Sequence, residues 1–203
     1  MNCNRIFGLT GGIGSGKSSV SRILSRQYGF AIVDADRLTR VAHAQREVCD
    51  ACVACFGVGV VQEENGAWRI DRRALSKIVF GNAENLAKLD RIMRPALEAL
   101  LRSELDFHAG AGRDSIVDAA LLFEASWDRF VQRVIVVTAP CDVRMARVMA
   151  RDGMDRLSCE RRMAAQMGEG ERCRRADWIL YNVGDEAMLS RQVACWYATL
   201  SDA

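Results

Sequence analysis

The residues with the clearest capacity for chemistry lie near the N-terminus, in the segment Gly11–Ser18, which has the spacing G-x-x-x-x-G-K-S. Glycines allow backbone conformations that other residues avoid, so successive amide N–H groups can surround phosphate oxygens. In such a segment the lysine reaches the β- and γ-phosphates of a nucleotide, and the hydroxyl that follows it ligates magnesium. We therefore expect Lys17 to bind phosphate and Ser18 to bind Mg²⁺. Switches, ATPases and kinases all use this segment, so it does not decide the reaction.

Aspartates follow two apolar runs farther along the chain. Asp34 and Asp36 come directly after Phe30–Val33, and Asp118 comes directly after Ser115–Val117. At the carboxyl end of a parallel strand, a carboxylate can orient or deprotonate an attacking hydroxyl, or it can support magnesium. We expect the first pair to act on a hydroxyl and Asp118 to act on the metal. The alternatives are helix capping for the pair and a strand-end turn for Asp118.

An arginine stripe is predicted in the second half of the chain. Arg144, Arg147 and Arg151 are three and four residues apart, which places them on one face of a helix. Guanidinium groups in this position can neutralise charge while a phosphoryl group moves from donor to acceptor. We expect Arg147 and Arg151 to contact phosphate and the neighbouring arginines to be solvated.

These side chains require a sheet whose strand ends meet at one edge. Apolar runs predict buried strands at Arg5–Leu9, Phe30–Val33, Ser115–Val117, Val134–Val137 and Trp178–Leu180. A helical pattern follows the glycine-rich segment and precedes the second strand. The order strand, loop, helix, strand predicts parallel pairing through a crossover helix, and hence an α/β fold.

A long stretch between the second and third strands, residues 37–113, is mostly helical in pattern. Within it, Gly57–Ile70 is expected to form a loop or hairpin around Asn65 and Gly66, a pair typical of turns. We expect this stretch to pack onto the main sheet as a subdomain that covers substrate.

Length and composition favour one globular core with inserted pieces, because the chain has 203 residues, of which 50% are hydrophobic and 27% charged. The net charge of +2 gives no general reason to expect a nucleic-acid or membrane partner. The N-terminal residues lack the apolar region of a secretory signal, and no apolar run has the length of a membrane helix. We expect a cytoplasmic protein with reduced cysteines, as a monomer or a small homo-oligomer.

Three of the cysteines have a spacing that also opens some iron–sulfur sites. Cys49, Cys52 and Cys55 form C-x-x-C-x-x-C, but no fourth cysteine follows in a suitable context. We interpret them instead as small buried thiols along a helix. An iron–sulfur protein remains the alternative.

The chain resembles the dephospho-CoA kinase family over almost its full length, through motifs that occur in the family's order. They are G-L-T-G-G-I-G-S-G-K-S at 8–18, I-V-D-A-D at 32–36, L-L-F-E at 121–124, M-A-R-D at 149–152 and A-A-Q-M at 164–167. The first is more specific than a bare phosphate-binding segment.

The resemblance implies a P-loop nucleoside-kinase-like fold, with a five-stranded parallel sheet flanked by helices. The core is expected at residues 1–36, 114–151 and 176–203. A helical insertion that binds the CoA moiety is expected at 37–113, and a lid at 152–175.

The resemblance also implies a reaction, in which ATP, with Mg²⁺, phosphorylates the ribose 3′-hydroxyl of dephospho-CoA. The implied catalytic residues are Asp36, Asp34, Lys17 and Arg147, with Asp36 the favoured base and Asp34 not excluded. The residues expected to bind ATP are Gly12, Ile13, Gly14, Ser15, Gly16, Lys17, Ser18, Ser19, Arg151 and Asn182. The acceptor is expected at Asp36, Arg94, Leu121 and Leu122, and the metal at Ser18 and Asp118.

The chain departs from the family pattern at three places. Arg94 stands where histidine is usual, Ala120 replaces the proline before L-L-F-E, and Tyr181 replaces a common aspartate. An arginine at position 94 can still meet an acceptor phosphate. The alternatives to this function are another metabolite or nucleotide kinase of the same fold, and a regulatory nucleotide-binding switch.

Overall fold

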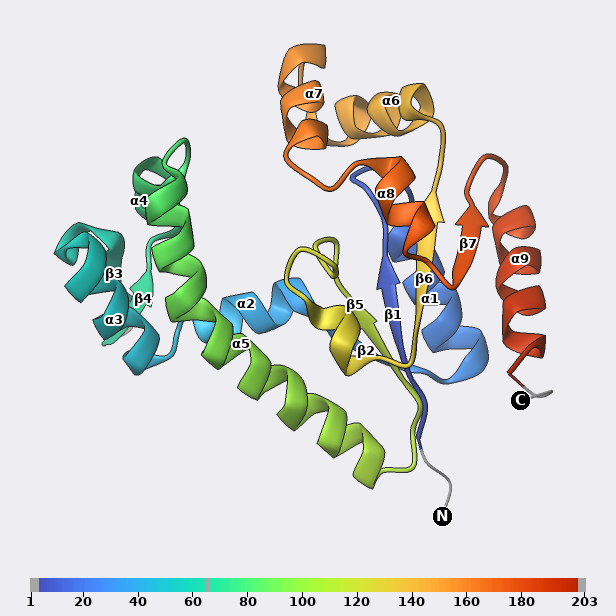
Figure 1. The fold of residues 1–203 in the computed structure, drawn as a ribbon, viewed down its shortest axis with the longest axis horizontal. Helices are drawn as coiled ribbons and strands as arrows, with labels where there is room; N and C mark the ends of the chain where they lie inside the picture. The colour runs from blue at the N-terminus through green and yellow to red at the C-terminus, as the bar shows by residue number, and fades with distance from the viewer. Residues whose placement is uncertain (1–3, 65, 201–203) are drawn as a thin grey trace. The chain divides into compact units, whose positions relative to one another are not determined.

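Strands and helices alternate along this computed structural model, which describes residues 4–64 and 66–200 (Figure 1). The strands are β1 (Ile6–Thr10), β2 (Ala31–Asp34), β3 (Val61–Glu64), β4 (Ala67–Ile70), β5 (Ser115–Asp118), β6 (Arg133–Thr138) and β7 (Trp178–Tyr181). The α-helices are α1 (Lys17–Tyr28), α2 (Ala35–Ala42), α3 (Arg46–Phe56), α4 (Arg72–Val79), α5 (Ala83–Gly110), α6 (Cys141–Asp152), α7 (Arg156–Ala164), α8 (Glu169–Arg174) and α9 (Glu186–Ala198). Short 3-10 helices are η1 (Val58–Val60) and η2 (Trp127–Phe130).

The main sheet has five parallel strands in the order β2-β5-β1-β6-β7. The predicted α/β class and the five predicted strands are therefore confirmed. Strand bounds differ from the prediction by a residue or so, and Asp34 and Asp118 are the last residues of β2 and β5 instead of following them. Because the strands are parallel, their carboxyl ends meet at one edge, which is where ligands bind in open sheets of this type.

Chain contacts divide the molecule into two compact units, Met1–Asp34 with Phe107–Ala203, and Ala35–Asp106. The first contains the five-stranded sheet. Helices α7 and α8, which cover most of the predicted lid range, belong to this first unit.

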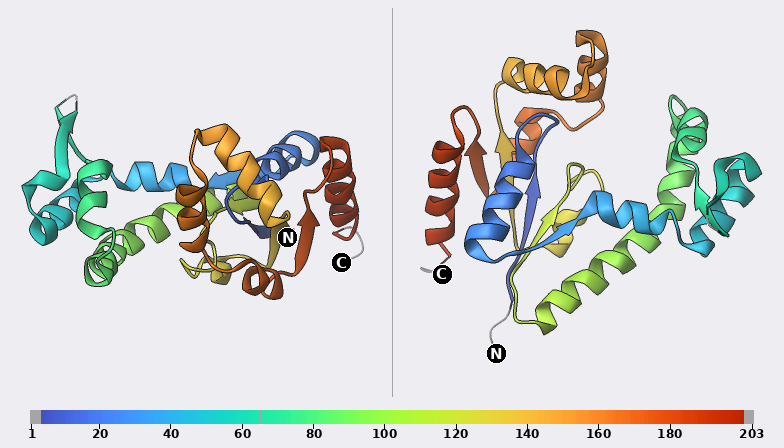
Figure 2. Two further views of the ribbon diagram at one scale, coloured as in Figure 1. Left: turned by 90° about the horizontal axis from the view of Figure 1, so that it is seen from above. Right: turned by 180° about the vertical axis from the view of Figure 1, so that it is seen from behind.

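The core of the first unit lies between the sheet and the pair α1 and α9, which pack side by side (Figure 2). An aromatic cluster anchors it, with the ring centroids of Phe7 and Trp196 5.1 Å apart and those of Phe7 and Phe30 6.0 Å apart. Each such side chain contributes roughly 1.5–3 kcal/mol when it is removed from water. The start of α1, which carries the glycine-rich segment, is thereby fixed against the sheet.

The second unit is mostly helical, as the sequence predicts, and has its own core. The predicted hairpin is present as the antiparallel pair β3 and β4, and Gly66 in its turn has φ +77°. Asn65, the other predicted turn residue, lies outside the described residues.

The cysteine segment forms α3, as predicted, but only two of its thiols are buried. Cys49 and Cys52 are fully buried, whereas Cys55 is exposed because it lies on the outer face of the helix. Burial is the main cause that raises the pKa of Cys52 to about 11, and the neighbouring Cys49 and Cys55 side chains add to it. This thiol is therefore protonated at neutral pH.

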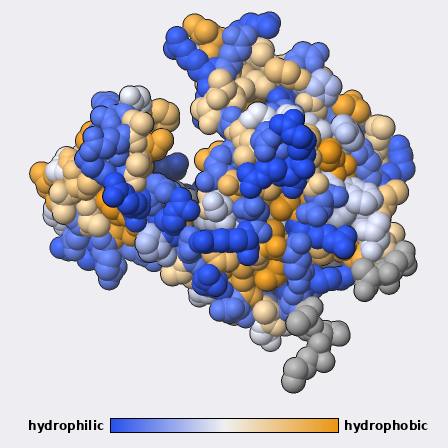
Figure 3. Space-filling view, in the orientation of Figure 1, coloured by the Kyte–Doolittle hydropathy of each residue, from blue (hydrophilic) through white to orange (hydrophobic). Residues whose placement is uncertain are grey.

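Hydrophilic residues cover most of the face shown in Figure 3, with apolar residues scattered among them, as is usual for the outer surface of folded domains. Among the helices within residues 4–64 and 66–200, none combines the length and apolar character needed to cross a bilayer.

Candidate functional site

The glycine-rich segment joins β1 to α1 and bends back on itself through backbone geometry. Gly14 and Gly16 have φ of +79° and +91°, the left-handed region where glycine is favoured. Gly16 caps α1 without a side-chain hydrogen bond, so the first N–H groups of the helix remain available to an anion. The Asn182 side-chain amide, which follows β7, donates to the Ser15 carbonyl at 2.8 Å and closes the loop from outside.

Charged side chains gather where β1, β5 and β2 end. Lys17, the first residue of α1, forms an ion pair with Asp118 at the end of β5. Asp118 is only 9% exposed, and strand register places it opposite Asp34 at the end of β2. A cation and two carboxylates are therefore brought together at one edge of the sheet. Ser18, the second residue of α1, is exposed.

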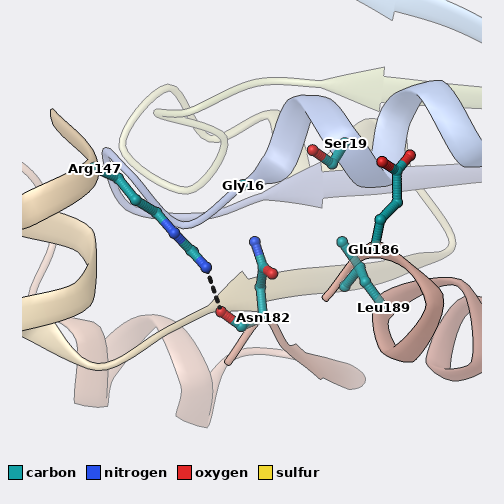
Figure 4. Close-up of a pocket in the computed structure, with 6 residues that line it drawn as sticks. All are labelled: Gly16, Ser19, Arg147, Asn182, Glu186 and Leu189. Atoms are coloured by element: carbon teal, nitrogen blue, oxygen red, sulfur yellow. Dashed lines mark hydrogen bonds between the residues drawn. The ribbon is translucent and has the colours of Figure 1, made fainter. Parts of the chain in front are cut away.

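A cavity of about 250 Å³ opens beside the start of α1. Its walls come from the glycine-rich segment, α1, α6, the residue after β7 and α9, and the lining residues are Gly16, Ser19, Arg147, Asn182, Glu186 and Leu189 (Figure 4). The Arg147 guanidinium donates to the Asn182 carbonyl at 3.1 Å and to the Gly14 carbonyl at 3.5 Å. Arg147 thus links α6 to the glycine-rich segment.

The A-A-Q-M segment, between α7 and α8, is tied to the same loop. The Ile13 N–H donates to Gln166 Oε1 at 2.8 Å, and the Met167 N–H donates to Glu124 Oε1 at 2.8 Å. The Ile13 side chain packs on the small core formed by Met145 and its neighbours in α6 and α7. Motifs that are far apart in the sequence are therefore joined around the glycine-rich segment.

A buried ionic cluster lies next to Gly12. Arg172 donates to Glu169 Oε2 at 2.8 Å and to the Met167 carbonyl at 2.7 Å. Arg144 reaches the same Glu169 oxygen at 3.3 Å. Arg172 is 1% exposed and Arg144 8%, so both guanidinium groups are almost fully removed from water.

Other predicted site residues stand apart from this group. Arg151 is exposed and pairs with Asp152 at 2.7 Å, so in this structure it does not line the cavity. Leu122 is fully buried beneath Gly8 and supports β1, whereas Leu121 is 49% exposed and accessible to a ligand.

Two predicted acceptor residues belong to the second unit. Asp36 is exposed in the first turn of α2, directly after β2 along the chain. Arg94, in α5, pairs with Asp90 at 2.6 Å.

Arg144 was predicted to be solvated, but it is buried because α6 packs against the glycine-rich segment. Four further residues of the site were not predicted from the sequence: Glu124, Gln166, Glu169 and Arg172. Glu124 lies in the L-L-F-E motif and Gln166 in the A-A-Q-M motif, so their place in these motifs could have suggested that they belong to the site. The spacing of Glu169 and Arg172 on α8 favours an ion pair, but only the fold places that pair against the glycine-rich segment.

The arrangement suits binding and activation of a nucleoside triphosphate. A ring of amides, a lysine and a helix N-terminus favour phosphate, and buried arginines add positive charge. The carboxylates at neighbouring strand ends can serve a metal or a hydroxyl.

Comparison with known proteins gives one consistent family. Residues 5–187 match the family model described as dephospho-CoA kinase. A dephospho-CoA kinase of Symbiobacterium thermophilum is 40% identical over 199 residues, which cover 96% of this chain and 81% of that protein. One from Carboxydothermus hydrogenoformans is 39% identical over 190 residues, covering 93% and 90%. A crystal structure of a Thermus thermophilus protein has a TM-score of 0.82 at 36% identity and covers 97% of this chain and 98% of that one. The chain therefore belongs to the dephospho-CoA kinase family.

Proposed function

We propose that this protein transfers the γ-phosphate of ATP to the ribose 3′-hydroxyl of dephospho-CoA, giving coenzyme A and ADP. The observation that carries the proposal is a complete phosphate cradle at the strand ends of a chain that matches this family over residues 5–187. We further propose that it acts in the cytoplasm as a monomer or a small homo-oligomer, without a nucleic-acid or membrane partner.

In this proposal the phosphates of ATP lie against the backbone amides of residues 12–19, and the nucleoside occupies the cavity beside Gly16. The position of that cavity at the start of α1 supports this placement. Lys17, which pairs with Asp118, exchanges this partner for the β- and γ-phosphates. Arg147 enters the same cavity and stabilises charge on the transferring group. Arg151 would join it only after leaving its pair with Asp152.

Ser18 and Asp118 fit magnesium, because both present hard oxygen donors next to the proposed phosphate site and magnesium is usually held by few protein oxygens. When bound there, the metal ion would neutralise charge on the β- and γ-phosphates. Release of Lys17 from Asp118 frees this carboxylate for the metal.

The acceptor is proposed to enter from the strand-end side, with the helical insertion at 37–113 and the lid at 152–175 contributing to its enclosure. Asp36 would remove the proton from the 3′-hydroxyl as it attacks, and Asp34 is the alternative base. Arg94 would pair with an acceptor phosphate after exchanging Asp90, and exposed Leu121 would contact an apolar part of the acceptor.

The test is release of ADP from MgATP by the purified protein with a panel of acceptors. Dephospho-CoA should stimulate ADP release far above background, whereas nucleoside monophosphates, gluconate and shikimate should not. Stimulation by one of the other acceptors instead would assign a different kinase activity. ATP binding without stimulation by any acceptor would favour a regulatory switch.

A further inference from the structure

The ionic cluster of Arg144, Glu169 and Arg172 is not balanced in charge. Two guanidinium groups share one carboxylate oxygen, Glu169 Oε2, at 3.3 and 2.8 Å. Among the described residues, the other hydrogen-bond partner of these arginine side chains is the neutral Met167 carbonyl. A positive charge is therefore left over in a site almost closed to water, which is costly unless an anion compensates it.

Polar atoms of the same cluster also lack partners. Arg144 Nε, Arg172 Nε and Glu169 Oε1 are buried without a hydrogen bond. Most buried polar atoms in folded proteins are paired, so unpaired ones indicate strain or a missing ligand. The Ser15 hydroxyl, inside the glycine-rich segment, is likewise buried and unpaired. Unsatisfied groups thus concentrate at the phosphate cradle.

The position of the cluster relative to Gly12 indicates which ligand would complete it. A Cβ atom on Gly12 would lie 2.2 Å from Arg144 Nη1 and 3.1 Å from Arg172 Nη1. Gly12 is not among the positive-φ glycines of the described residues, so a larger residue there would be opposed by the close approach of the Arg144 side chain and not by the backbone conformation. The Arg144 guanidinium consequently lies directly on the second residue of the cradle.

We propose that Arg144 binds the terminal phosphate of ATP, and that Arg172 is a positioning residue that acts through Glu169. Arg172 draws part of the Glu169 charge to itself and holds this carboxylate on α8, which leaves Arg144 under-neutralised beside Gly12. This inference rests on the proposed function for its ligand. It adds an arginine of α6 to the phosphate site, one helical turn before Arg147.

The terminal phosphate distinguishes ATP from ADP, so the ratio of their affinities reports on Arg144 without any acceptor or turnover. Calorimetric titration of the full chain with ATP and with ADP, both with Mg²⁺, measures this ratio. Arg144→Met should lower the preference for ATP about tenfold or more, because a charge-assisted hydrogen bond is lost. Arg172→Met should change the ratio in the same direction, since Glu169 would then neutralise Arg144 alone.

Two further variants keep the test decisive if an arginine variant does not fold. Glu169→Gln removes the shared negative charge and should raise the preference for ATP, the opposite sign. Gly12→Ala leaves the arginines in place but displaces the flexible end of Arg144, so it should lower the preference. The matched control is Arg174→Met, on the same helix, where the arginine is exposed and pairs with Glu171 at 2.5 Å; its ratio should equal that of the parent.

A folded Arg144→Met with the parental ATP-to-ADP ratio would overturn the inference, and so would a Glu169→Gln ratio that falls with the others. If the variants changed only the affinity for dephospho-CoA, the cluster would belong to the acceptor site, and the inference would also be overturned. Failure of the proposed function is recognised separately, because it would appear in the parent protein as absence of ATP binding or of dephospho-CoA phosphorylation.

Discussion

Lys17 and Asp118 form an ion pair at the end of the sheet, in which each compensates the charge of the other. In the proposed function, phosphate replaces Asp118 as the partner of the lysine. The role of Lys17 in that proposal is electrostatic, because a cation that is already positioned would stabilise charge on the transferring phosphoryl group.

Lys17→Ala should therefore reduce turnover by at least about 10²–10³-fold, the scale of losing one preorganised charge-stabilising group. The fold should survive, because the loop is held by its glycine conformations and by the bond from Asn182 to Ser15. Steady-state kinetics and a circular dichroism spectrum check both points. A folded variant that keeps half of the parental rate would contradict the assigned role.

The proposed role of Asp36 as the base can be tested by a single substitution. Asp36→Asn keeps the size of the side chain and much of its capacity to cap a helix but removes the base, so turnover should fall by roughly 10²–10⁴-fold while ATP affinity barely changes. If Asp36 only caps α2, turnover and melting temperature should both stay near the parent values.

Asp34→Asn is the matched control for that substitution. A near-normal rate in Asp36→Asn together with a collapsed rate in Asp34→Asn would move the base to Asp34. Normal rates in both variants would contradict a carboxylate base in this protein.

The sequence predicts those features that depend only on the spacing of residues close together in the chain. The glycines, Lys17 and Ser18 lie within one short segment, so this segment could be recognised from the sequence alone. Arg144 and Arg172 are far apart in the chain, and their meeting on Glu169 depends on how α6 and α8 pack. Other arginines lie close to them in the chain, and the sequence does not reveal which of these guanidinium groups is buried.

Among the elements, the segment between α7 and α8 is joined directly to the glycine-rich segment. Gln166 accepts the Ile13 N–H, and Glu124 accepts the Met167 N–H. These two hydrogen bonds hold the segment between α7 and α8 to the glycine-rich segment on one side and to Glu124 on the other.

Gln166→Ala should release that anchor, because it removes the acceptor of the Ile13 N–H and a bond worth about 0.5–1.5 kcal/mol. Hydrogen exchange of the amides in residues 164–174 should become faster, and turnover should fall modestly without global unfolding. Gln62→Ala, at an exposed glutamine of β3, is the control and should leave exchange in 164–174 unchanged. Parental exchange in the Gln166 variant would contradict the anchoring role.

The strands were predictable because each is a short apolar run that must be buried between helices. The ends of the strands were harder to predict, because Asp34 and Asp118 extend the β-ladder by one residue although they are charged. In α3 the helical period was recognised, but the period alone does not say which face of the helix is covered. Cys55 is consequently exposed although its spacing matches that of Cys49 and Cys52.

For the whole molecule, the sequence contained enough to predict the α/β class and the family, because the motifs span the chain in order. Division into units depends on contacts between distant residues, which no local pattern reports. The structure places the first division at Asp34 and Ala35, between the two carboxylates that the sequence treats as a pair. Asp34 and Asp36, the two candidate bases, therefore belong to different units although only one residue separates them.

Identification of the reaction products tests the proposed phosphoryl transfer to dephospho-CoA. Purified protein is incubated with MgATP and dephospho-CoA, and the products are separated by chromatography and analysed by mass spectrometry and ³¹P NMR. We expect ADP and coenzyme A in equal amounts, with the new phosphate on the ribose 3′-oxygen and no coenzyme A from a Lys17→Ala control. ADP without coenzyme A, or a phosphate on any other oxygen of dephospho-CoA, would contradict the proposed transfer.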